Sequence, residues 1–383
     1  MKDSTSLIQD LKVLNNLPKL WRVLPFSKVI SDVSGGNKKT KKGDLLEEGL
    51  IRVIDQGKEL IAGYTDDKRT IVKTKIPHIV FGDHTRIIKY IDFPFAMGAD
   101  GTKVLKAKSE KETFEKYIYY FFLTLNIPNT GYNRHFKYLK DCLIPLPPLE
   151  TQKKIAAILD EADKLRQLNK QLIAKYEALT QSLFSEMFGD PLTNNLGFDF
   201  PKMKELCVVS QGMQIAIKNR FKEDGKNRYK YLTVAFLNGR KDGEFIENPR
   251  KSVVCHEDEI LMTRTGNTGQ VVTGVEGVFH NNFFKVDWKR EIIQKDYFVA
   301  FLSNPNIRLE LLKRASTTTI PDLSHGQFYD INVVLPPLAL QNQFADRMKE
   351  IKQQKALAQE ALQKSEDLFN SLLQKAFKGE LVK

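Results

Sequence analysis

The sequence contains little that could form a disulfide framework, a membrane span or a secretory signal. Three of its 383 residues are cysteine, namely Cys142, Cys207 and Cys255, and their odd number and wide spacing fit a reducing compartment. No stretch approaches the roughly 18 consecutive apolar residues of a membrane helix. The first residues also lack the apolar core of a signal peptide. We therefore expect a cytoplasmic protein with no membrane-spanning segment.

Motifs of common enzyme classes are also missing. The sequence contains no G-x-x-x-x-G-K-S/T phosphate loop and no Asn-Pro-Pro-Tyr-like tetrapeptide of the kind that amino-methyltransferases carry. The run Thr265–Gly269 lacks the strand–turn–helix setting of a dinucleotide site, and Cys255-His256 has no second pair at metal-ligand spacing. His84 and His135 are distinguished only by their polar neighbours. We expect no catalytic residue and no metal site.

The balance of charges is basic. Lys and Arg number 59 against 47 Asp and Glu, which gives a net charge of +12 at pH 7. Excess positive charge favours a polyanionic partner, because neutralised phosphates release condensed counterions. A basic protein without such a partner fits the balance equally well. Charge alone therefore leaves both readings open.

The sequence repeats itself over a long period. Leu146-Pro147-Pro148-Leu149 recurs as Leu335-Pro336-Pro337-Leu338, and Gln152 recurs as Gln341, at one offset of 189 residues (335 − 146). The offset persists downstream, where Phe188 corresponds to Phe377. It predicts two tandem copies of one unit, each with a globular segment, a Pro-Pro hinge and a helix.

Each hinge precedes a long helix. Residues 150–188 contain no Gly or Pro before a stop at Gly189-Asp190-Pro191, and residues 339–377 are likewise free of both. About 40 residues at 1.5 Å each form a rod of roughly 60 Å, longer than a packed domain usually needs. Apolar residues at alternating steps of four and three predict that the two helices pack on each other, with one polar position that fixes the register. The alternative is that each helix only covers its own domain. The predicted seam residues are Ile158, Leu165, Asn169 (the polar position), Leu172, Leu179 and Leu183 in the first helix, and Ile351, Leu368 and Leu372 in the second.

Both globular segments are predicted to consist of short strands separated by turns. In the first, Ile51–Ile54 and Ile79–Phe81 are β-branched runs bounded by turn residues. In the second, Tyr231–Ala235 and Glu259–Arg264 occupy the corresponding places. A helix is predicted over 110–125, and its aromatic residues fit a core better than a base-stacking face. The segments share a plan but little residue identity, which suits two different binding surfaces on a constant scaffold.

Polar loop clusters are the candidate contacts with a nucleic acid. Arg and Asn suit bidentate hydrogen bonds to guanine and adenine edges, while Thr, Lys and backbone amides beside Gly suit phosphates. An ordinary polar turn or a solvated basic loop is the alternative at each position. The predicted DNA contacts in the first segment are Lys38, Lys39, Lys41, His84, Thr85, Arg86, Asp100, Thr102, Lys103, Tyr132, Asn133, Arg134 and His135. The predicted DNA contacts in the second segment are Thr263, Arg264, Thr265, Asn267, Thr268, Thr317, Thr318 and Thr319.

The order of these features resembles the specificity subunit of type I restriction-modification systems, and the resemblance spans almost the whole chain. One departure is the N-terminus, where about twenty residues precede Trp21-Arg22; an extra helix or a partner contact would account for them. The stretches that carry the resemblance are Val53–Gly57, Phe81–Arg86, Gly131–Phe136, Asp258–Gly266, Thr318–Pro321 and Ala376–Leu381.

The resemblance implies an α+β fold. Two mixed α/β target recognition domains would form a tandem pseudo-symmetric repeat, each followed by a long helix, and the two helices would pack as an antiparallel coiled coil. The implied boundaries are 1–145 for the first recognition domain, 146–190 for its hinge and helix, 191–334 for the second recognition domain, and 335–383 for the second hinge and helix.

The resemblance also implies a function. Each domain would read one half of a split sequence in double-stranded DNA, and the helices would set the spacing between the halves. The chain would be non-catalytic and hold no cofactor itself. It would recruit two methyltransferase subunits, which use S-adenosylmethionine, and restriction subunits, which use ATP, through the helix seam and outer helix faces. The alternatives are a recognition fragment of a self-contained restriction–methylation enzyme, or a coiled-coil adaptor that does not bind DNA.

Overall fold

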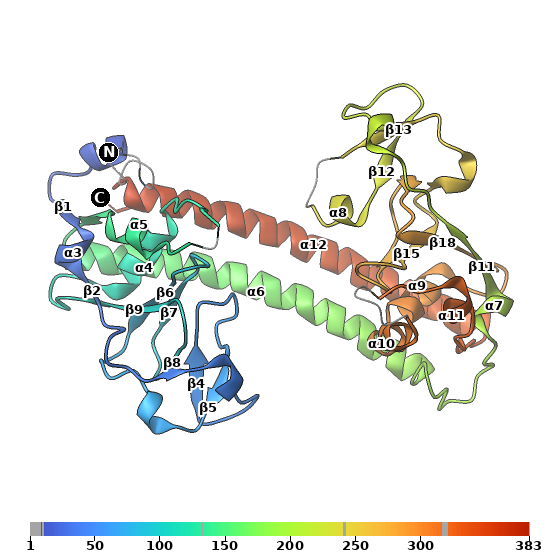
Figure 1. The fold of residues 1–383 in the computed structure, drawn as a ribbon, viewed down its shortest axis with the longest axis horizontal. Helices are drawn as coiled ribbons and strands as arrows, with labels where there is room; N and C mark the ends of the chain where they lie inside the picture. Colours follow the sequence, from blue (N-terminus) through green and yellow to red (C-terminus); the bar gives the residue numbers. More distant parts are fainter. Residues whose placement is uncertain (1–8, 10, 132, 240–242, 316–320, 383) are drawn as a thin grey trace. The chain divides into compact units, whose positions relative to one another are not determined.

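The computed structural model describes residues 9, 11–131, 133–239, 243–315 and 321–382 (Figure 1). Residue contacts divide the chain into two units, and the divisions fall inside the two long helices. Unit 1 combines Met1–Lys170 with Glu360–Lys383, and unit 2 is Gln171–Gln359. Within the described part of the chain, no helix is long and apolar enough to cross a membrane.

Unit 1 contains two four-stranded sheets and a two-stranded ladder. The first sheet is antiparallel, in the order β2-β9-β6-β7, and the second has the order β3-β8-β4-β5. β1 pairs with β10 and so joins the start of the domain to its hinge. The strands are β1 (Arg22–Pro25), β2 (Ile30–Asp32), β3 (Lys39–Thr40), β4 (Ile51–Ile54), β5 (Gly63–Thr65), β6 (His78–Gly82), β7 (Ile88–Ile91), β8 (Ala96–Gly98), β9 (Thr102–Ala107) and β10 (Leu143–Leu146). The short helices are α2 (Leu11–Asn15), α3 (Phe26–Val29), α4 (Glu115–Leu123) and α5 (Phe136–Lys140).

Unit 2 repeats this plan. Its antiparallel sheet has the order β11-β18-β15-β16, and its second sheet has the order β13-β12-β17-β14. The strands are β11 (Cys207–Gln211), β12 (Arg228–Leu232), β13 (Phe245–Glu247), β14 (Val254–Cys255), β15 (Ile260–Thr263), β16 (Val271–Val272), β17 (Gly277–Phe279) and β18 (Phe283–Trp288). The short helices are α7 (Met203–Leu206), α8 (Val234–Leu237), α9 (Lys295–Ser303), α10 (Pro305–Arg314) and α11 (His325–Tyr329).

The registers confirm that the two domains are copies of one α+β unit. In each second sheet, two parallel strands pair, β4 with β8 in unit 1 and β12 with β17 in unit 2. The fourth strand of that sheet differs, because β3 runs parallel to β8 whereas β14 runs antiparallel to β17. The strand segments that the sequence predicts to be equivalent in the two domains are therefore equivalent in the structure. Within Tyr231–Ala235, however, the strand ends at Leu232 and α8 begins at Val234.

Aromatic residues build both cores, as the sequence predicts for the helix within 110–125. In unit 1, α4 packs on β6 and β7, and its Tyr117, Phe121 and Phe122 are buried. Their spacing of one and four residues puts a wide face of the helix against the sheet. In unit 2, α9 buries Tyr297 and Phe301 in the same way.

The repeated hinge motif is explained by its glutamine. Gln152 is fully buried; its Oε1 accepts from the Phe114 amide at 2.9 Å, and its Nε2 donates to the carbonyls of Glu112 and Pro147 at 2.8 Å each. Gln341 is also fully buried, with Oε1 accepting from the Gln294 amide at 2.9 Å. A buried amide without such partners would be costly. The motif thus locks the first turn of each long helix onto its own domain.

The long helices are α6 (Leu149–Phe188) and α12 (Leu338–Phe377), and they pair in each unit. In unit 1, Arg166 stacks over the Phe369 ring at 4.3 Å, while Asn169 Nδ2 donates to Ser365 Oγ at 3.2 Å. Later residues of α6 thus meet earlier residues of α12, so the helices are antiparallel there. In unit 2, the Phe184 and Phe344 rings lie 6.0 Å apart, and Lys355 pairs with Glu177 at 2.8 Å, with the same direction.

Each long helix ends in the core of the unit opposite to the one in which it begins. The Phe188 ring of α6 lies 4.7 Å from Tyr297 in unit 2, and the Phe377 ring of α12 lies 5.2 Å from Tyr117 in unit 1. These two phenylalanines are the pair related by the offset of 189 residues. The core of each domain therefore includes the end of the long helix from the other repeat. We call this arrangement the closed repeat.

The predicted helix seam is right at four positions and wrong at five. Asn169, Leu183, Ile351 and Leu372 turn inward. The wrong positions, with their exposed fractions, are Ile158 (38%), Leu165 (45%), Leu172 (39%), Leu179 (48%) and Leu368 (46%). In α6 the residue that turns inward is the next one along in each case, and two of these four, Arg166 and Thr180, are polar. A seam predicted from apolar residues alone therefore lies on the exposed helix face next to the packed face, because successive residues are about 100° apart around the helix axis.

Candidate nucleic-acid interface

Loops distant in the sequence meet at one edge of unit 1, and we call them loop cluster 1 (residues 55–57, 82–87, 98–103, 130–131 and 133–136). The Asp83 amide donates to the Gly101 carbonyl at 2.7 Å, and the His135 amide donates to the Asp83 carbonyl at 2.8 Å. The His84 amide donates to Gln56 Oε1 at 3.1 Å, and His84 Nδ1 lies 3.2 Å from the Asn133 carbonyl. The described residues of the polar clusters predicted at 82–86, 98–103 and 131–135 are thus brought together.

Buried polar groups hold loop cluster 1 from below. Asp83 is 4% exposed, and its Oδ1 accepts from the Phe136 amide at the start of α5 at 2.8 Å. Two residues other than glycine adopt left-handed backbone conformations here, Arg86 (φ 64°) and Asp100 (φ 48°). Such conformations cost free energy, concentrate at functional sites and persist only where surrounding contacts enforce them. Contacts with buried groups thus hold these turns in one defined conformation.

The predicted contacts of unit 1 fall into three groups. Lys39, Lys41, Thr85, Asp100, Asn133 and Arg134 are exposed, while His84, Arg86 and Lys103 are half-buried. Lys38 is exposed but pairs with Asp67 at 2.6 Å. Thr102 and His135 are buried at 3% and 0% exposure. These two predictions are corrected: both side chains lie inside the domain, and His135 Nδ1 lies 2.9 Å from the Asp83 carbonyl. Tyr132 lies outside the described residues.

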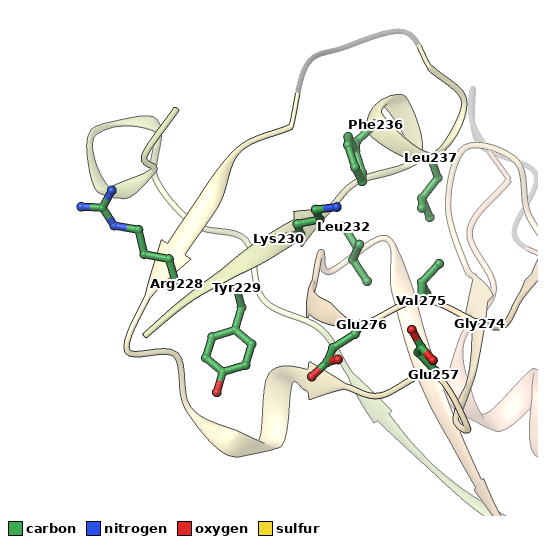
Figure 2. A pocket seen from close by; sticks show the side chains of 10 residues that line it. All are labelled: Arg228, Tyr229, Lys230, Leu232, Phe236, Leu237, Glu257, Gly274, Val275 and Glu276. Atoms are coloured by element: carbon green, nitrogen blue, oxygen red, sulfur yellow. The ribbon is translucent and has the colours of Figure 1, made fainter. Parts of the chain in front are cut away.

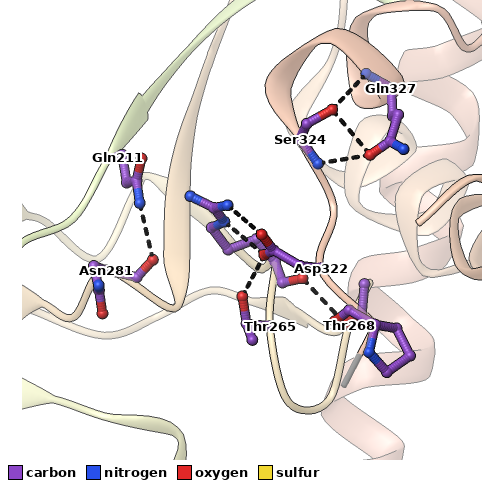
Figure 3. A network of polar contacts seen from close by, with 9 residues as sticks. Gln211, Thr265, Thr268, Asn281, Asp322, Ser324 and Gln327 are labelled. Carbon is purple, nitrogen blue, oxygen red and sulfur yellow. Dashed lines mark hydrogen bonds and ion pairs between the residues drawn. The ribbon is translucent and has the colours of Figure 1, made fainter. Parts of the chain in front are cut away.

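Unit 2 carries a second convergence, loop cluster 2 (residues 211–213, 264–270, 280–283 and 321–324). Arg264 donates to both carboxylate oxygens of Asp322, from Nε at 3.0 Å and from Nη2 at 2.7 Å. Thr265 Oγ1 donates to the same carboxylate, and Gln211 Nε2 donates to the Asn281 carbonyl at 3.4 Å (Figure 3). The hydrogen bonds from Arg264 lower the pKa of the Asp322 carboxyl. This bidentate pair ties the turn after β15 to the segment before α11.

The structure revises part of the second prediction as well. Thr263 and Thr268 are buried at 1% and 2% exposure, and Thr268 Oγ1 donates to the Pro321 carbonyl at 2.8 Å, so both are internal to the domain. Arg264 is half-buried and occupied by Asp322. Asn267 is exposed, and its Oδ1 accepts from Arg308 Nη2 at 2.6 Å. Thr317, Thr318 and Thr319 lie outside the described residues.

Sequence reasoning missed the residues that organise these clusters. Gln56 belongs to a stretch that carries the family resemblance, yet it follows a buried strand and has no basic neighbour on its N-terminal side to mark it as a contact. Asp322 and Arg308 are ordinary charged residues in the sequence. Their roles depend on pairings across 58 and 41 positions, which no local pattern reveals.

A cavity of about 580 Å³ opens in unit 2 away from the predicted contacts (Figure 2). Tyr229, Phe236 and Leu237 line it together with Glu257 and Glu276. Arg228 and Lys230 also line the cavity, so its two carboxylates are balanced by two basic side chains. None of the DNA contacts predicted from the sequence lines this cavity.

Metal and thiol chemistry find no support in the described part of the chain. No group of three or more His, Cys, Asp or Glu side chains there is placed to hold a metal ion. The three cysteines are buried, and burial raises the pKa of Cys207 to about 12 and that of Cys255 to about 11. Protonated, buried thiols are poor nucleophiles.

Known proteins share this sequence pattern. The family described as type I restriction modification DNA specificity domain matches residues 27–178 and 195–366, one match for each repeat. The specificity subunit of a type I restriction enzyme from Escherichia coli is 26% identical over 180 residues, which cover 46% of this chain and 42% of that protein. Another from Methanocaldococcus jannaschii is 24% identical over 245 residues, 56% of each protein. The chain thus spans about half the length of the curated relatives it matches.

Solved structures share the fold. The S subunit of a type I restriction-modification system from M. genitalium superposes with a TM-score of 0.56 at 17% identity, covering 95% of this chain and 97% of that one. A chain from a structural study of complex assembly and conformational transition of the type I restriction-modification system superposes with a TM-score of 0.51 at 16% identity. The match covers 95% of this chain and 99% of that one.

Proposed function

The chain belongs to the family of type I restriction modification DNA specificity domains, and from this premise we propose that it is a non-catalytic subunit that selects a DNA sequence. The observation that carries the proposal is the duplication. One scaffold occurs twice with the same antiparallel sheet, the same parallel strand pair in the second sheet and the same hinge anchors, while the loop clusters that it presents differ. Two different surfaces on equivalent frames suit the two unlike halves of a split target.

The chemistry of the loop clusters supports contact with DNA. Arg134 and Asn133 are exposed in loop cluster 1, and Asn267 is exposed in loop cluster 2. Arg and Asn side chains distinguish guanine and adenine edges in the major groove. Lys39 in β3 and Lys41 directly after it are exposed and suit the sugar–phosphate backbone. The net charge of +12 supports such an interface.

We assign the chemistry of the complex to partner subunits. Two methyltransferase subunits would bind S-adenosylmethionine and flip the target adenines, and restriction subunits would use ATP. The helices α6 and α12 would set the separation of the half-sites. A system of this kind acts in the cytoplasm, where the host DNA lies.

An exposed apolar face of α6 supports the recruitment of protein partners. Ile158, Leu165, Leu172 and Leu179 recur every seven residues, and Leu168, 51% exposed, lies between them. We call these five residues the α6 leucine stripe. Apolar side chains aligned on one helix face mark a surface that a partner covers.

Domain exchange tests the proposal. Replacing residues 1–145 with the corresponding segment of another type I specificity subunit is expected to change one half of the recognised sequence and leave the other half intact. The target is read by adenine methylation after co-expression with the methyltransferase subunit. A change in both halves, or in neither, would contradict two independent reading domains. Binding of S-adenosylmethionine by the isolated chain would contradict its non-catalytic role.

A further inference from the structure

Gln56 joins the two sheets of unit 1 at loop cluster 1. It follows β4 in the second sheet and is half-buried. Its Oε1 accepts from the His84 amide at 3.1 Å, and its own carbonyl accepts from Thr85 Oγ1. His84 and Thr85 belong to the turn after β6, in the first sheet. One residue therefore binds both the backbone and a side chain of a turn in another sheet.

The space around Gln56 is tightly filled. A Cβ atom added to Gly101 would lie 2.7 Å from Gln56 Oε1, and one added to Gly82 would lie 3.0 Å from Gln56 Cβ. Non-bonded carbon atoms pack best at about 3.5–4.0 Å. A Cβ atom at either glycine would therefore lie too close to Gln56. The backbones of the two loops thus approach the Gln56 side chain as closely as glycine permits.

The turn that Gln56 holds needs such support. Its Arg86 is left-handed at φ 64°, and the buried Arg86 Nε has no hydrogen-bond partner among the described residues. The His84 ring in turn contacts the Asn133 carbonyl. A chain of contacts therefore runs from Gln56 through His84 to the loop that presents Asn133 and Arg134.

Unit 2 holds the equivalent turn by a different contact. Ile54 of β4 pairs with Met97, and Leu232 of β12 pairs with Phe279 in the equivalent register. The counterpart of Gln56, two residues further on, is therefore Val234, whose side chain has no hydrogen-bonding group. There the Arg264–Asp322 pair fixes the turn after the equivalent strand. The glutamine clamp is thus particular to loop cluster 1.

From this geometry we infer that Gln56 is a positioning residue that determines base selectivity in the half-site read by unit 1. The inference rests on the proposed function. Gln56 acts through its Oε1 acceptor, which fixes His84, and through it the loop that carries Asn133 and Arg134. The Gln56 side chain is half-buried and its Oε1 accepts from the His84 amide, so we assign it a positioning role and not a base contact.

Two substitutions test whether the Oε1 acceptor of Gln56 or its whole side-chain amide group is needed. Gln56→Met keeps the length of the side chain and removes the acceptor, whereas Gln56→Glu keeps an oxygen that can accept from the His84 amide. The full-length chain, co-purified with its methyltransferase subunits, is first assayed on randomised duplexes to define both half-sites. The affinity ratio between the preferred duplex and single-base variants is then measured for each half-site. Repulsion between phosphates and the negative charge introduced by Gln56→Glu would lower all affinities alike and cancel in this ratio.

For Gln56→Met we expect the ratio to fall about tenfold in one half-site. We expect it to stay unchanged in the other half-site, which also shows that the variant chain folds, while Gln56→Glu stays close to the parent. An unchanged ratio in Gln56→Met, an equal loss in Gln56→Glu, or a change in both half-sites would overturn the inference. Absence of any sequence preference in the parent complex would instead overturn the proposed function.

Discussion

Single buried or half-buried polar residues determine how the domains present their loops. Asp83 anchors loop cluster 1 from inside unit 1, and Asp322 does so through Arg264 in unit 2. Gln152 and Gln341 fasten the helices. Each satisfies backbone groups or a charged partner that would otherwise be buried at a cost of about 1–3 kcal/mol. These residues shape the candidate interface without needing to touch DNA.

Buried His78 makes the stability of unit 1 depend on pH. Burial and the nearby Lys106 lower its pKa from 6.5 to about 4, while Thr74 Oγ1 lies 2.7 Å from its Nε2. The folded state favours the neutral ring, so its contribution is present above pH 6.5 and is lost as the pH falls from 6.5 towards 4. We expect unit 1 to lose on the order of 3 kcal/mol across this window.

The substitution His78→Gln is expected to reduce that loss, since glutamine does not titrate. Urea unfolding of the full chain at pH 7 and at pH 5 measures the difference. The exposed His256 provides a matched control, because His256→Gln removes a histidine that is not buried. An equal pH dependence in His78→Gln and in the parent would show that His78 does not cause it.

At this scale the sequence indicates which segments form the interface but not which side chains face outward. Thr85 and Thr102 are both threonines in polar stretches beside glycine, yet one is exposed and the other is buried. Strand pairing decides between them, because Thr102 pairs with Gly82 inside the sheet. Such pairing is a tertiary property that local composition does not contain.

The secondary-structure elements follow more directly from the sequence. The helices predicted over 150–188 and 339–377 begin one residue earlier in the structure, at Leu149 and Leu338. Proline before the first turn and glycine after the last fix these ends. The seam was harder to predict, because packing between α6 and α12 buries the polar Arg166 stem over Phe369 and leaves leucines exposed.

Substitutions in the α6 leucine stripe are expected to weaken partner binding without lowering the stability of the fold. The double substitution Leu165→Ser and Leu172→Ser is expected to weaken association with the methyltransferase subunit at least tenfold. Exposed positions rarely change the free energy of unfolding by more than about 0.5 kcal/mol each, so the fold should persist. Co-purification and thermal unfolding measure the two effects.

Leu159 is the matched control for the stripe. It lies on the same helix but is fully buried in the core of unit 1, so Leu159→Ala should cost about 2–5 kcal/mol of stability. Full association of the Leu165→Ser, Leu172→Ser variant would show that the partner binds elsewhere.

For the whole molecule, the closed repeat links helix length to target length. One extra turn of four residues in both α6 and α12 adds about 6 Å, or one to two base pairs at about 3.4 Å each. We expect both half-sites to be kept and the unspecified spacer between them to lengthen by that amount. Methylation mapping of the variant complex would reveal the change. A spacer of unchanged length would contradict the role of the helices.

The same insertion in α6 alone provides the control. It would shift Asn169 against Ser365 or Glu177 against Lys355, pairs that the antiparallel helices form within the units. We therefore expect a lower thermal midpoint for this single insertion than for the matched pair. Equal midpoints would show that the register between the helices contributes nothing measurable.

The most direct test of the central claim is a long-read methylation map of the host genome with and without this gene, with the methyltransferase partner expressed in both. Two reading domains predict that deletion removes one adenine-methylated motif, made of two defined segments separated by a constant number of unspecified bases. Loss of a single continuous motif, or an unchanged map, would contradict the assignment of this chain as the subunit that selects the DNA sequence.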